Sequence, residues 1–315
     1  MKENAMLKHQ RFGVEVEFTG ITRKQAADIV AEVLCMGVTG PGSSPYYTRQ
    51  IIDRQGRSWK VMRDSSINPE PRMSDEYKVE FVTPPLNYED IPLLQTIIRN
   101  FRASGAKANS SCGIHVHVDG ANHGAKSIRR LVNFMTSRQD IIYEALGIGA
   151  RADHWCKKLD GELLKEMKQN PDITTNAIEK IWYSPANDGY FGGVCPSQHY
   201  NSTRYHGCNL HAYFSKGTIE FRLFNSTLHA GKIKAYIQFC LAVSGWAITS
   251  DEHIAFKNMA GYTPEQKVTI MRSILNNRLG LGGDEFKTCR LWMMKRLKDN
   301  AGTTTRIPRR QRVSA

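Results

Sequence analysis

The sequence predicts an α+β fold in which an antiparallel sheet is packed against helices. Two observations indicate this class: several segments alternate apolar and polar residues with the period of strands, and segments with helical spacing separate them. A third observation is that helical patterns dominate after residue 230. We therefore expect a core over residues 1–230, a C-terminal helical annex over 231–300 packed on that core, and a basic flexible tail over 301–315.

The first half of the chain supplies most of the expected strands. Residues 11–18 (RFGVEVEF) alternate strictly, which is typical of a strand with one face in a core. Thr22 followed by Gln25 forms a capping-box pattern and predicts the start of a helix that ends before Gly37. Three more strands are expected, with a turn at Gly56 joining the first two as a hairpin: about 46–53, 59–63 and 77–82.

The second half alternates between regular and irregular stretches. Residues 149–205 are rich in Asn, Asp, Tyr and Gly and predict loops, with short helical pieces near 161–168 and 174–181. The segments CNLHAYF (208–214) and TIEFRLF (218–224) predict two strands around a turn at Lys216 and Gly217. The remaining elements are a strand over GIHVHVD (113–119) and helices over about 88–102, 127–145, 231–250, 264–278 and 284–298.

Composition and charge limit the class of protein. The chain is 41% hydrophobic and 23% charged, which is ordinary for a globular protein. Its seven cysteines form no C-x-x-C pair and the N-terminus is too polar for a signal peptide, so we expect reduced thiols and a cytoplasmic protein. The net charge of +13 fits a solvated surface and an anionic or nucleic-acid-linked partner equally well. No stretch is long and apolar enough to predict a membrane span.

Three predicted strands each carry a pair of polar residues on one face. Residues two apart on a strand share a face, so Glu15 lies beside Glu17 while the valines between and around them face the core. The other two pairs are His115 with His117 and Glu220 with Arg222. Carboxylates, imidazoles and a guanidinium are the groups that a site for metal ions and phosphates requires.

Two further acids extend this set of candidate ligands. Asp64 follows a predicted strand in VMRDSSI, and Glu80 lies within the strand YKVEFV. Together with Glu15, Glu17 and Glu220 they provide five carboxylates. That number is sufficient for two or more Mg²⁺ ions, which prefer oxygen ligands.

The ordered motifs resemble those of the amidoligase family. They are FGVEVEF, RDSSI, VEFVTPPL, CGIHVHVD, RYHGCNLHAYF and GTIEFRLFN, and they span about residues 11–230. This family is similar to glutamine synthetase and glutamate-cysteine ligase, which are carboxylate-amine ligases. The resemblance implies a glutamine synthetase-like curved antiparallel sheet that carries the active site, with helices outside.

The resemblance also implies a role for each motif residue. The implied metal ligands are Glu15, Glu17, Glu80, Glu220 and His115. The implied nucleotide or phosphate contacts are His115, His117 and Asn209. The implied catalytic residues are Arg222 at the transferred phosphoryl group, Arg204 as a second anion-binding arginine, and Asp64.

The implied reaction uses ATP and at least two Mg²⁺ ions to join a carboxylate to an amine through an acyl phosphate. Charge neutralisation is its main requirement, because a carboxylate must approach a polyphosphate. The carboxylate belongs to a small molecule or a protein, and assembly into a homo-oligomer stays open.

Two other functional classes stay open at this point. A zinc hydrolase would use the His-x-His strand with a third donor among His199, His206 and His211. A basic nucleic-acid-associated protein is suggested by charge alone. A cysteine nucleophile is disfavoured, because Cys112 and His115 are three apart on a strand and face opposite ways.

Overall fold

The computed structural model describes residues 6–170, 172–184, 198, 201–252, 254–255 and 258–302. Within this part of the chain, the strands form one eight-stranded antiparallel sheet in the order β2-β3-β4-β5-β1-β6-β8-β7. The strands are β1 (Phe12–Phe18), β2 (Val38–Thr39), β3 (Arg49–Ile52), β4 (Ser58–Met62), β5 (Val79–Val82), β6 (Gly113–Asp119), β7 (Cys208–Asn209) and β8 (Thr218–Asn225). The predicted α+β class and the predicted hairpin at Gly56 are confirmed.

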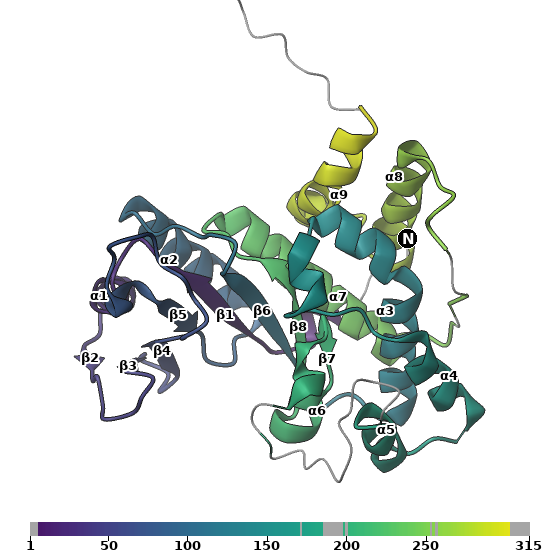
Figure 1. Ribbon diagram of the computed structural model, residues 1–315, viewed down its shortest axis with the longest axis horizontal. Helices are drawn as coiled ribbons and strands as arrows, with labels where there is room; N and C mark the ends of the chain where they lie inside the picture. The colour runs from purple at the N-terminus through teal and green to yellow at the C-terminus, as the bar shows by residue number, and fades with distance from the viewer. Residues whose placement is uncertain are drawn as a thin grey trace, which may run out of the picture.

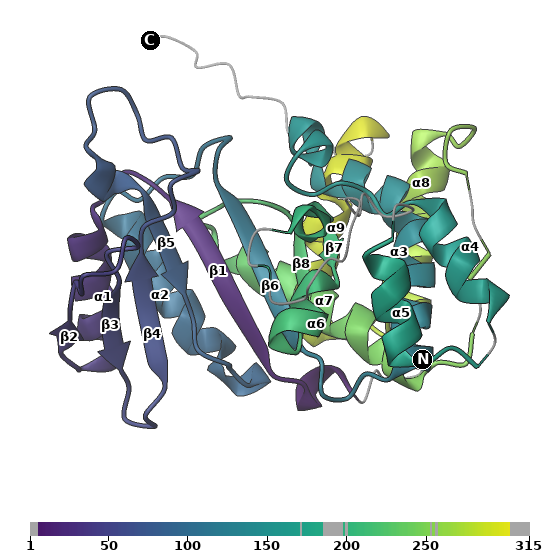
Figure 2. The same ribbon diagram turned by 60° about the horizontal axis from the view of Figure 1, so that its bottom comes forward.

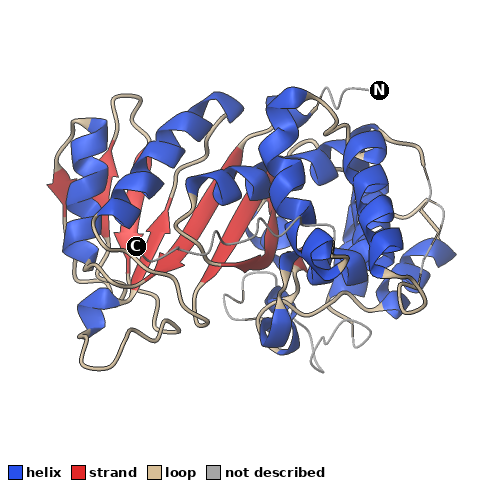
Figure 3. Ribbon diagram, turned by 90° about the horizontal axis from the view of Figure 1, so that it is seen from above, coloured by secondary structure: helices blue, strands red, loops and turns tan. Residues whose placement is uncertain are grey.

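The helices lie mainly on one side of the sheet and beyond its β7 edge, as Figure 1 and Figure 3 show. They are α1 (Arg23–Leu34), α2 (Ile91–Ala103), α3 (Ala125–Leu146), α4 (Gly161–Gln169), α5 (Thr175–Trp182), α6 (His211–Lys216), α7 (Ala230–Thr249), α8 (Pro264–Ser273) and α9 (Lys287–Asn300). Among the described residues, no helix is long and apolar enough to cross a membrane.

The core fills the space between the sheet and the helices that cover it. Phe101 of α2 contacts both Phe18 of β1 and Phe81 of β5, with ring centroids 4.9 and 5.1 Å apart. Helix α7 packs against α2, α3, α9 and β6, which explains why its sequence is apolar on nearly every side. The opposite face of the sheet carries no helix over β3, β4, β5 and β1 in Figure 2.

Local signals in the sequence fix several element ends. The capping box at Thr22 and Gln25 is present at the start of α1, and that of Thr263 and Gln266 at the start of α8. Helix α8 is shorter than predicted, because Ile274–Arg278 continues it as a π-helical turn.

The predicted strand over 208–214 is wrong for most of its length. Only Cys208 and Asn209 pair with β8, and the chain then turns into helix α6. The Asn209 side chain accepts the backbone N–H of His211 and so starts this turn, while Gly217 ends α6 in a left-handed conformation. Residues 208–212 are buried throughout, so their alternation does not reflect one buried and one exposed face.

The predicted division at residues 230 and 300 stays a prediction. Helices α7, α8 and α9 pack on one another and, through α7, on the sheet. Residues 303–315, most of the predicted tail, lie outside the described residues.

Candidate functional site

Strand register brings the three predicted polar pairs onto one face of the sheet. Glu15 of β1 lies opposite His115 of β6, and Glu17 lies opposite Glu80 of β5. His117 in turn lies opposite Glu220 of β8. Partners that lie directly opposite in an antiparallel pair point to the same side, so these groups converge.

The face behind these residues is apolar. Val14, Val16 and Phe18 alternate with the acids of β1 and are at most 1% exposed. Ile114 and Val116 of β6 are likewise buried in the core. The burial of one face therefore fixes the direction of the other, because a shift of one residue would place the acids in the core.

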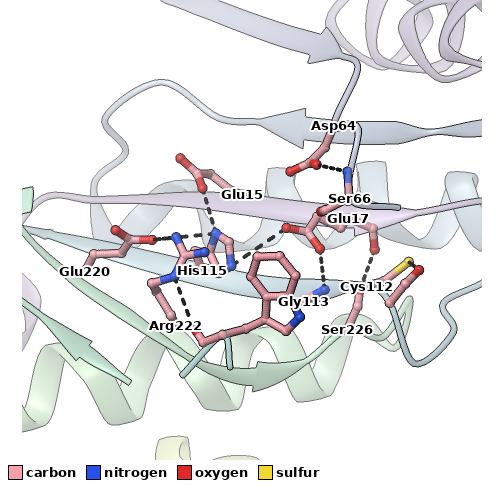
Figure 4. A network of polar contacts seen from close by, with 12 residues as sticks. Glu15, Glu17, Asp64, Ser66, Cys112, Gly113, His115, Glu220, Arg222 and Ser226 are labelled. Atoms are coloured by element: carbon pink, nitrogen blue, oxygen red, sulfur yellow. Dashed lines mark hydrogen bonds and ion pairs between the residues drawn. The ribbon is translucent and has the colours of Figure 1, made fainter. Parts of the chain in front are cut away.

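The two histidines connect the central carboxylates. Nδ1 of His115 lies 2.8 Å from Oε2 of Glu15, and its Nε2 lies 3.8 Å from Oε1 of Glu17. Nε2 of His117 lies 3.2 Å from Oε1 of Glu15, and its Nδ1 lies 3.0 Å from the Thr218 hydroxyl. Figure 4 shows Glu15, Glu17 and His115 pointing toward one another across β1 and β6.

Glu220 is held by two donors. Nη1 of Arg222 donates to Oε1 of Glu220 at 2.6 Å, and the amide of Asn209 donates to its Oε2, also at 2.6 Å. All three side chains are at most 6% exposed. The Arg222 guanidinium also lies over the Tyr205 ring, 5.9 Å from its centroid.

A second group of acids lies toward the other end of this face. Glu17, Asp64 and Glu80 each place a carboxylate oxygen within 4.8 Å of the others. The backbone N–H of Gly113 donates to Oε2 of Glu17 at 2.6 Å, and that of Ser66 donates to Asp64 at 2.7 Å (Figure 4). Two further groups with the same spacing are Glu15, Glu80 and His115, and Glu15, His117 and Glu220.

The electrostatics of these acids differ along the face. Burial raises the pKa of Glu80 well above its ordinary value, and the neighbouring Glu15, Glu17 and Asp64 raise it further. Burial likewise raises the pKa of Glu17. Burial opposes ionisation of Glu220 too, but Arg222 and the histidines lower its pKa to about 2.

The pKa values of Glu15 and His117 are shifted in opposite directions. Burial would raise the pKa of Glu15, yet His117 and His115 hold it well below the usual range. Burial would lower the pKa of His117, yet Glu15 and Glu220 raise it. Where β1, β6 and β8 meet, the acids of the site are thus balanced by histidines and Arg222. The group formed by Glu17, Asp64 and Glu80 has an excess of acids instead.

This donor set fits divalent cations. The protein alone cannot keep Glu17 and Glu80 both ionised at low cost, as the raised pKa of each carboxyl shows. A cation bound by the oxygens would remove that repulsion, and hard oxygen ligands suit Mg²⁺. The metal-ligand role of these residues stays a prediction.

A cavity of about 370 Å³ opens beside the charged face. Gly13, Glu15 and His117 are among the residues that line it. Its other walls include Val82, Pro85, Lys216 and Thr218. The volume is within the range of small-molecule sites.

The structure does not bring every predicted residue into this cluster. Arg204 is half-buried and its guanidinium lies over the Tyr205 ring, 5.7 Å from the ring centroid. Cys112 is buried just before β6, and burial raises the pKa of its thiol, consistent with a packing role. A thiol that stays protonated is a poor nucleophile.

The two described candidates for a third zinc donor, His206 and His211, have other partners. Nδ1 of His206 donates to the Thr203 carbonyl at 2.9 Å, and Nδ1 of His211 lies 2.7 Å from the Tyr183 hydroxyl. Neither belongs to a candidate ligand group of the described residues, and His199 lies outside those residues. No observation therefore favours this alternative.

Sequence reasoning missed Arg151. Its guanidinium lies against Gly113, where a side-chain carbon would come within 2.4 Å of Nη2. This contact places it beside Glu17, whose pKa it lowers against the dominant effect of burial. Arg151 belongs to an irregular stretch with no periodic pattern, so no sequence signal marks it.

The fold and the site define a class of protein in which a polar, carboxylate-rich centre occupies one face of an antiparallel sheet. The family model described as "Putative amidoligase enzyme" matches residues 8–244 of the 315. The chain therefore belongs to this amidoligase family, and its general activity is that of a ligase. No curated protein matches the chain.

Proposed function

We propose that the protein is an ATP- and Mg²⁺-dependent carboxylate-amine ligase with a glutamine synthetase-like sheet. The observation that carries the proposal is the convergence of five carboxylates, two imidazoles and Arg222 on one sheet face. Family membership adds the reaction class. An amidoligase uses a carboxylate and an amine as substrates, and forms an amide bond between them.

The residues of the site divide into those suited to metals and those suited to phosphates. Glu17, Asp64 and Glu80 would hold one cation, and Glu15 with Glu220 or His115 would hold another. When bound, Mg²⁺ would neutralise the phosphate charge and polarise the γ-phosphoryl group. The cavity lined by Gly13 would take the nucleotide, with His117 in its wall.

The proposed reaction has two steps, transfer of a phosphoryl group and formation of the amide. A carboxylate oxygen attacks the γ-phosphorus of ATP, the bond to the β,γ-bridging oxygen breaks, and ADP leaves. The amine nitrogen then attacks the acyl carbon, phosphate leaves, and the nitrogen loses a proton. Arg222 stabilises the transferred phosphoryl group, because Glu220 and the Tyr205 ring fix its guanidinium in place.

Trapping the acyl phosphate with hydroxylamine tests this mechanism. The full chain is incubated with ATP, Mg²⁺, hydroxylamine and a set of carboxylates, and ADP and hydroxamate are measured by mass spectrometry. We expect equal amounts of ADP and hydroxamate, and loss of both when Arg222 is replaced by Gln. Release of AMP and pyrophosphate instead would contradict the acyl-phosphate mechanism.

A further inference from the structure

Arg151 stands at the edge of the acid-rich face without belonging to any of the recognised motifs. It lies in the 3-10 helix Gly149–Asp153, and its side chain reaches Gly113, the first residue of β6. Its guanidinium is stacked on Gly113, since Nη2, Nη1 and the guanidinium carbon all lie within 3.1 Å of where a β-carbon would be. The same glycine donates its N–H to Glu17. Arg151 is therefore a direct neighbour of the candidate metal site.

The backbone around Arg151 is firmly held. Its carbonyl accepts the N–H groups of Trp155 and Cys156 at 2.9 and 3.1 Å, which closes a tight turn. The Tyr143 hydroxyl donates to the Cys156 carbonyl at 2.7 Å. The following residue, Lys157, donates its N–H to the Tyr205 carbonyl at 2.8 Å. The turn is thus tied to the segment that carries the Tyr205 ring beneath Arg222.

Arg151 lacks the acidic partner that a structural arginine has. Arg23, which is 2% exposed, lies 2.8 Å from Glu76 and 3.3 Å from Asp75. In the described part of the chain, no carboxylate lies within 4.0 Å of the Arg151 nitrogens. Among the described residues its Nε is buried without a hydrogen-bond partner, and its side chain forms a hydrogen bond with the thiol of Cys156. A half-buried cation with these neighbours has donors left for an anion.

The surroundings of Arg151 favour a carboxylate attached to an apolar chain. A guanidinium matches a carboxylate with two parallel N–H donors. Trp155, four residues on, is 43% exposed, and its indole meets the edge of Tyr205 at 5.6 Å between ring centroids. These rings form an apolar wall beside Arg222, whose guanidinium lies over the Tyr205 ring and whose Nε lies 3.5 Å from the backbone carbonyl of Trp155. Methylene groups of a substrate can pack against this wall.

We propose that Arg151 binds a second, non-reacting carboxylate of the substrate, so that the enzyme acts on dicarboxylates. The inference rests on the proposed ligase function, in which the reacting carboxylate lies at Arg222 and the metal ions. Arg151 then selects the substrate by its distal carboxylate, and Trp155 covers the carbon chain between the two. Monocarboxylates would leave the guanidinium without its anion and bind more weakly.

Ligand-dependent thermal unfolding tests this assignment without requiring turnover. The full chain with Mg²⁺ is unfolded in glutarate or in butyrate, which share a four-carbon acyl unit and differ by one carboxylate, at matched ionic strength. We expect glutarate to raise the melting temperature by about 2 °C or more beyond butyrate. Equal shifts for the two probes, or no shift for either, would overturn the proposal.

Variants identify the residue responsible. Arg151→Gln should abolish the excess shift caused by glutarate, and Arg151→Lys should keep part of it. Arg272→Gln, at an exposed arginine of α8, is the matched control and should leave the shift unchanged. If Arg151→Gln only lowers the melting temperature and keeps the glutarate shift, Arg151 is structural and the proposal fails. If Arg151→Gln does not fold, Arg151→Lys is compared with wild type instead. A glutarate shift as large as that of wild type would then overturn the proposal.

The nucleotide separates this inference from the proposed function. A non-hydrolysable ATP analogue with Mg²⁺ should raise the melting temperature of wild type and of Arg151→Gln alike. Loss of the nucleotide shift in Arg151→Gln would reassign Arg151 to phosphate and overturn the dicarboxylate proposal. A glutarate shift without any nucleotide shift would instead preserve the role of Arg151 and contradict the ligase mechanism.

Discussion

The outer strands β3, β4 and β5 and the central strands β1, β6 and β8 belong to one sheet. The acidic side chains near the outer strands are paired with donors, whereas those of the central strands are grouped together. In the outer region, Asp53 accepts donors from Arg57 and Trp59, and Asp75 lies beside Arg23 and Arg63. In the central region, five acids lie near two arginines, Arg222 and Arg151, and two histidines. Paired charges in the outer region stabilise the fold, whereas we propose that the excess of acids in the central region binds cations.

The pKa values follow this difference. Burial is opposed by hydrogen bonds from Trp59 and Arg57 in the case of Asp53, and the pKa of Asp53 is lowered. The pKa of Asp75 is also lowered, because Arg63 outweighs burial. Glu17 and Glu80 show the opposite shift. Ionised acids in the two regions therefore have opposite effects on stability.

The largest expected effect separates activity from stability at Glu17. Glu17→Gln removes a candidate metal ligand but keeps an oxygen that can accept the Gly113 N–H. Hydroxamate formation should fall by about 10²- to 10³-fold. The free energy of unfolding, measured with urea, should stay unchanged or rise, because the charge is costly where it lies. Glu89→Gln, at an exposed glutamate, should change neither quantity.

The next effect is a loss of stability in the outer region. Arg23→Ala leaves Asp75 and Glu76 without their buried partner and removes donors to the carbonyls of Asp75 and Lys78. The free energy of unfolding should fall by about 1.5 to 3 kcal/mol, the loss expected for hydrogen bonds that involve a charged group. Lys24→Ala, one residue on at a highly exposed position, should cost less than about 1 kcal/mol. Equal losses for the two variants would contradict a structural role for Arg23.

Magnesium should stabilise the central region selectively. At concentrations well above its dissociation constant, Mg²⁺ should raise the free energy of unfolding by about 1 to 3 kcal/mol, and EDTA should reverse this. The reason is that a cation relieves repulsion among Glu17, Asp64 and Glu80. The double variant Glu17→Gln, Glu80→Gln should lose most of this gain. An unchanged gain in that variant would place the cation elsewhere.

The smallest expected effect is a pH dependence of opposite sign in the two regions. The pKa of Glu80 in the folded protein lies above its ordinary value of 4.5. At pH values between 4.5 and the raised pKa, the folded protein therefore binds more protons than the unfolded protein. Without Mg²⁺, stability should fall as pH rises through that window, and Glu80→Gln should flatten the fall.

Asp75 should behave in the reverse way. Its pKa in the fold lies below its ordinary value of 3.8, so its stabilisation is present above that value and is lost as pH falls through the folded pKa. Asp75→Asn should therefore reduce acid sensitivity. Urea unfolding at a series of pH values measures both trends, and slopes of the same sign for the two acids would contradict this comparison.

Much of the fold could be predicted because its signals are local. The alternation of β1 and β6 is strict, and the capping boxes of α1 and α8 set the positions of helix starts. The same alternation placed Glu15 with Glu17 and His115 with His117 on common faces. These predictions follow from the geometry of a single strand or helix and need no information about neighbours.

Other features depend on neighbours and could not be predicted. The segment after Asn209 has the composition of a strand, but its helix α6 depends on burial against the rest of the chain. Arg151 gives no signal in an irregular stretch, and its role comes from contact with Gly113, 38 positions earlier.

The sequence by itself determined which side chains share a face, because the side-chain period of a strand is fixed by backbone geometry. Only the tertiary structure decided that Glu15 meets His115 and that Glu17 meets Glu80. Register between distant strands is set by the burial of Val14, Val16 and their partners in a shared core, which no single segment contains. The candidate ligand pairs are thus encoded locally, whereas the candidate site is assembled by packing.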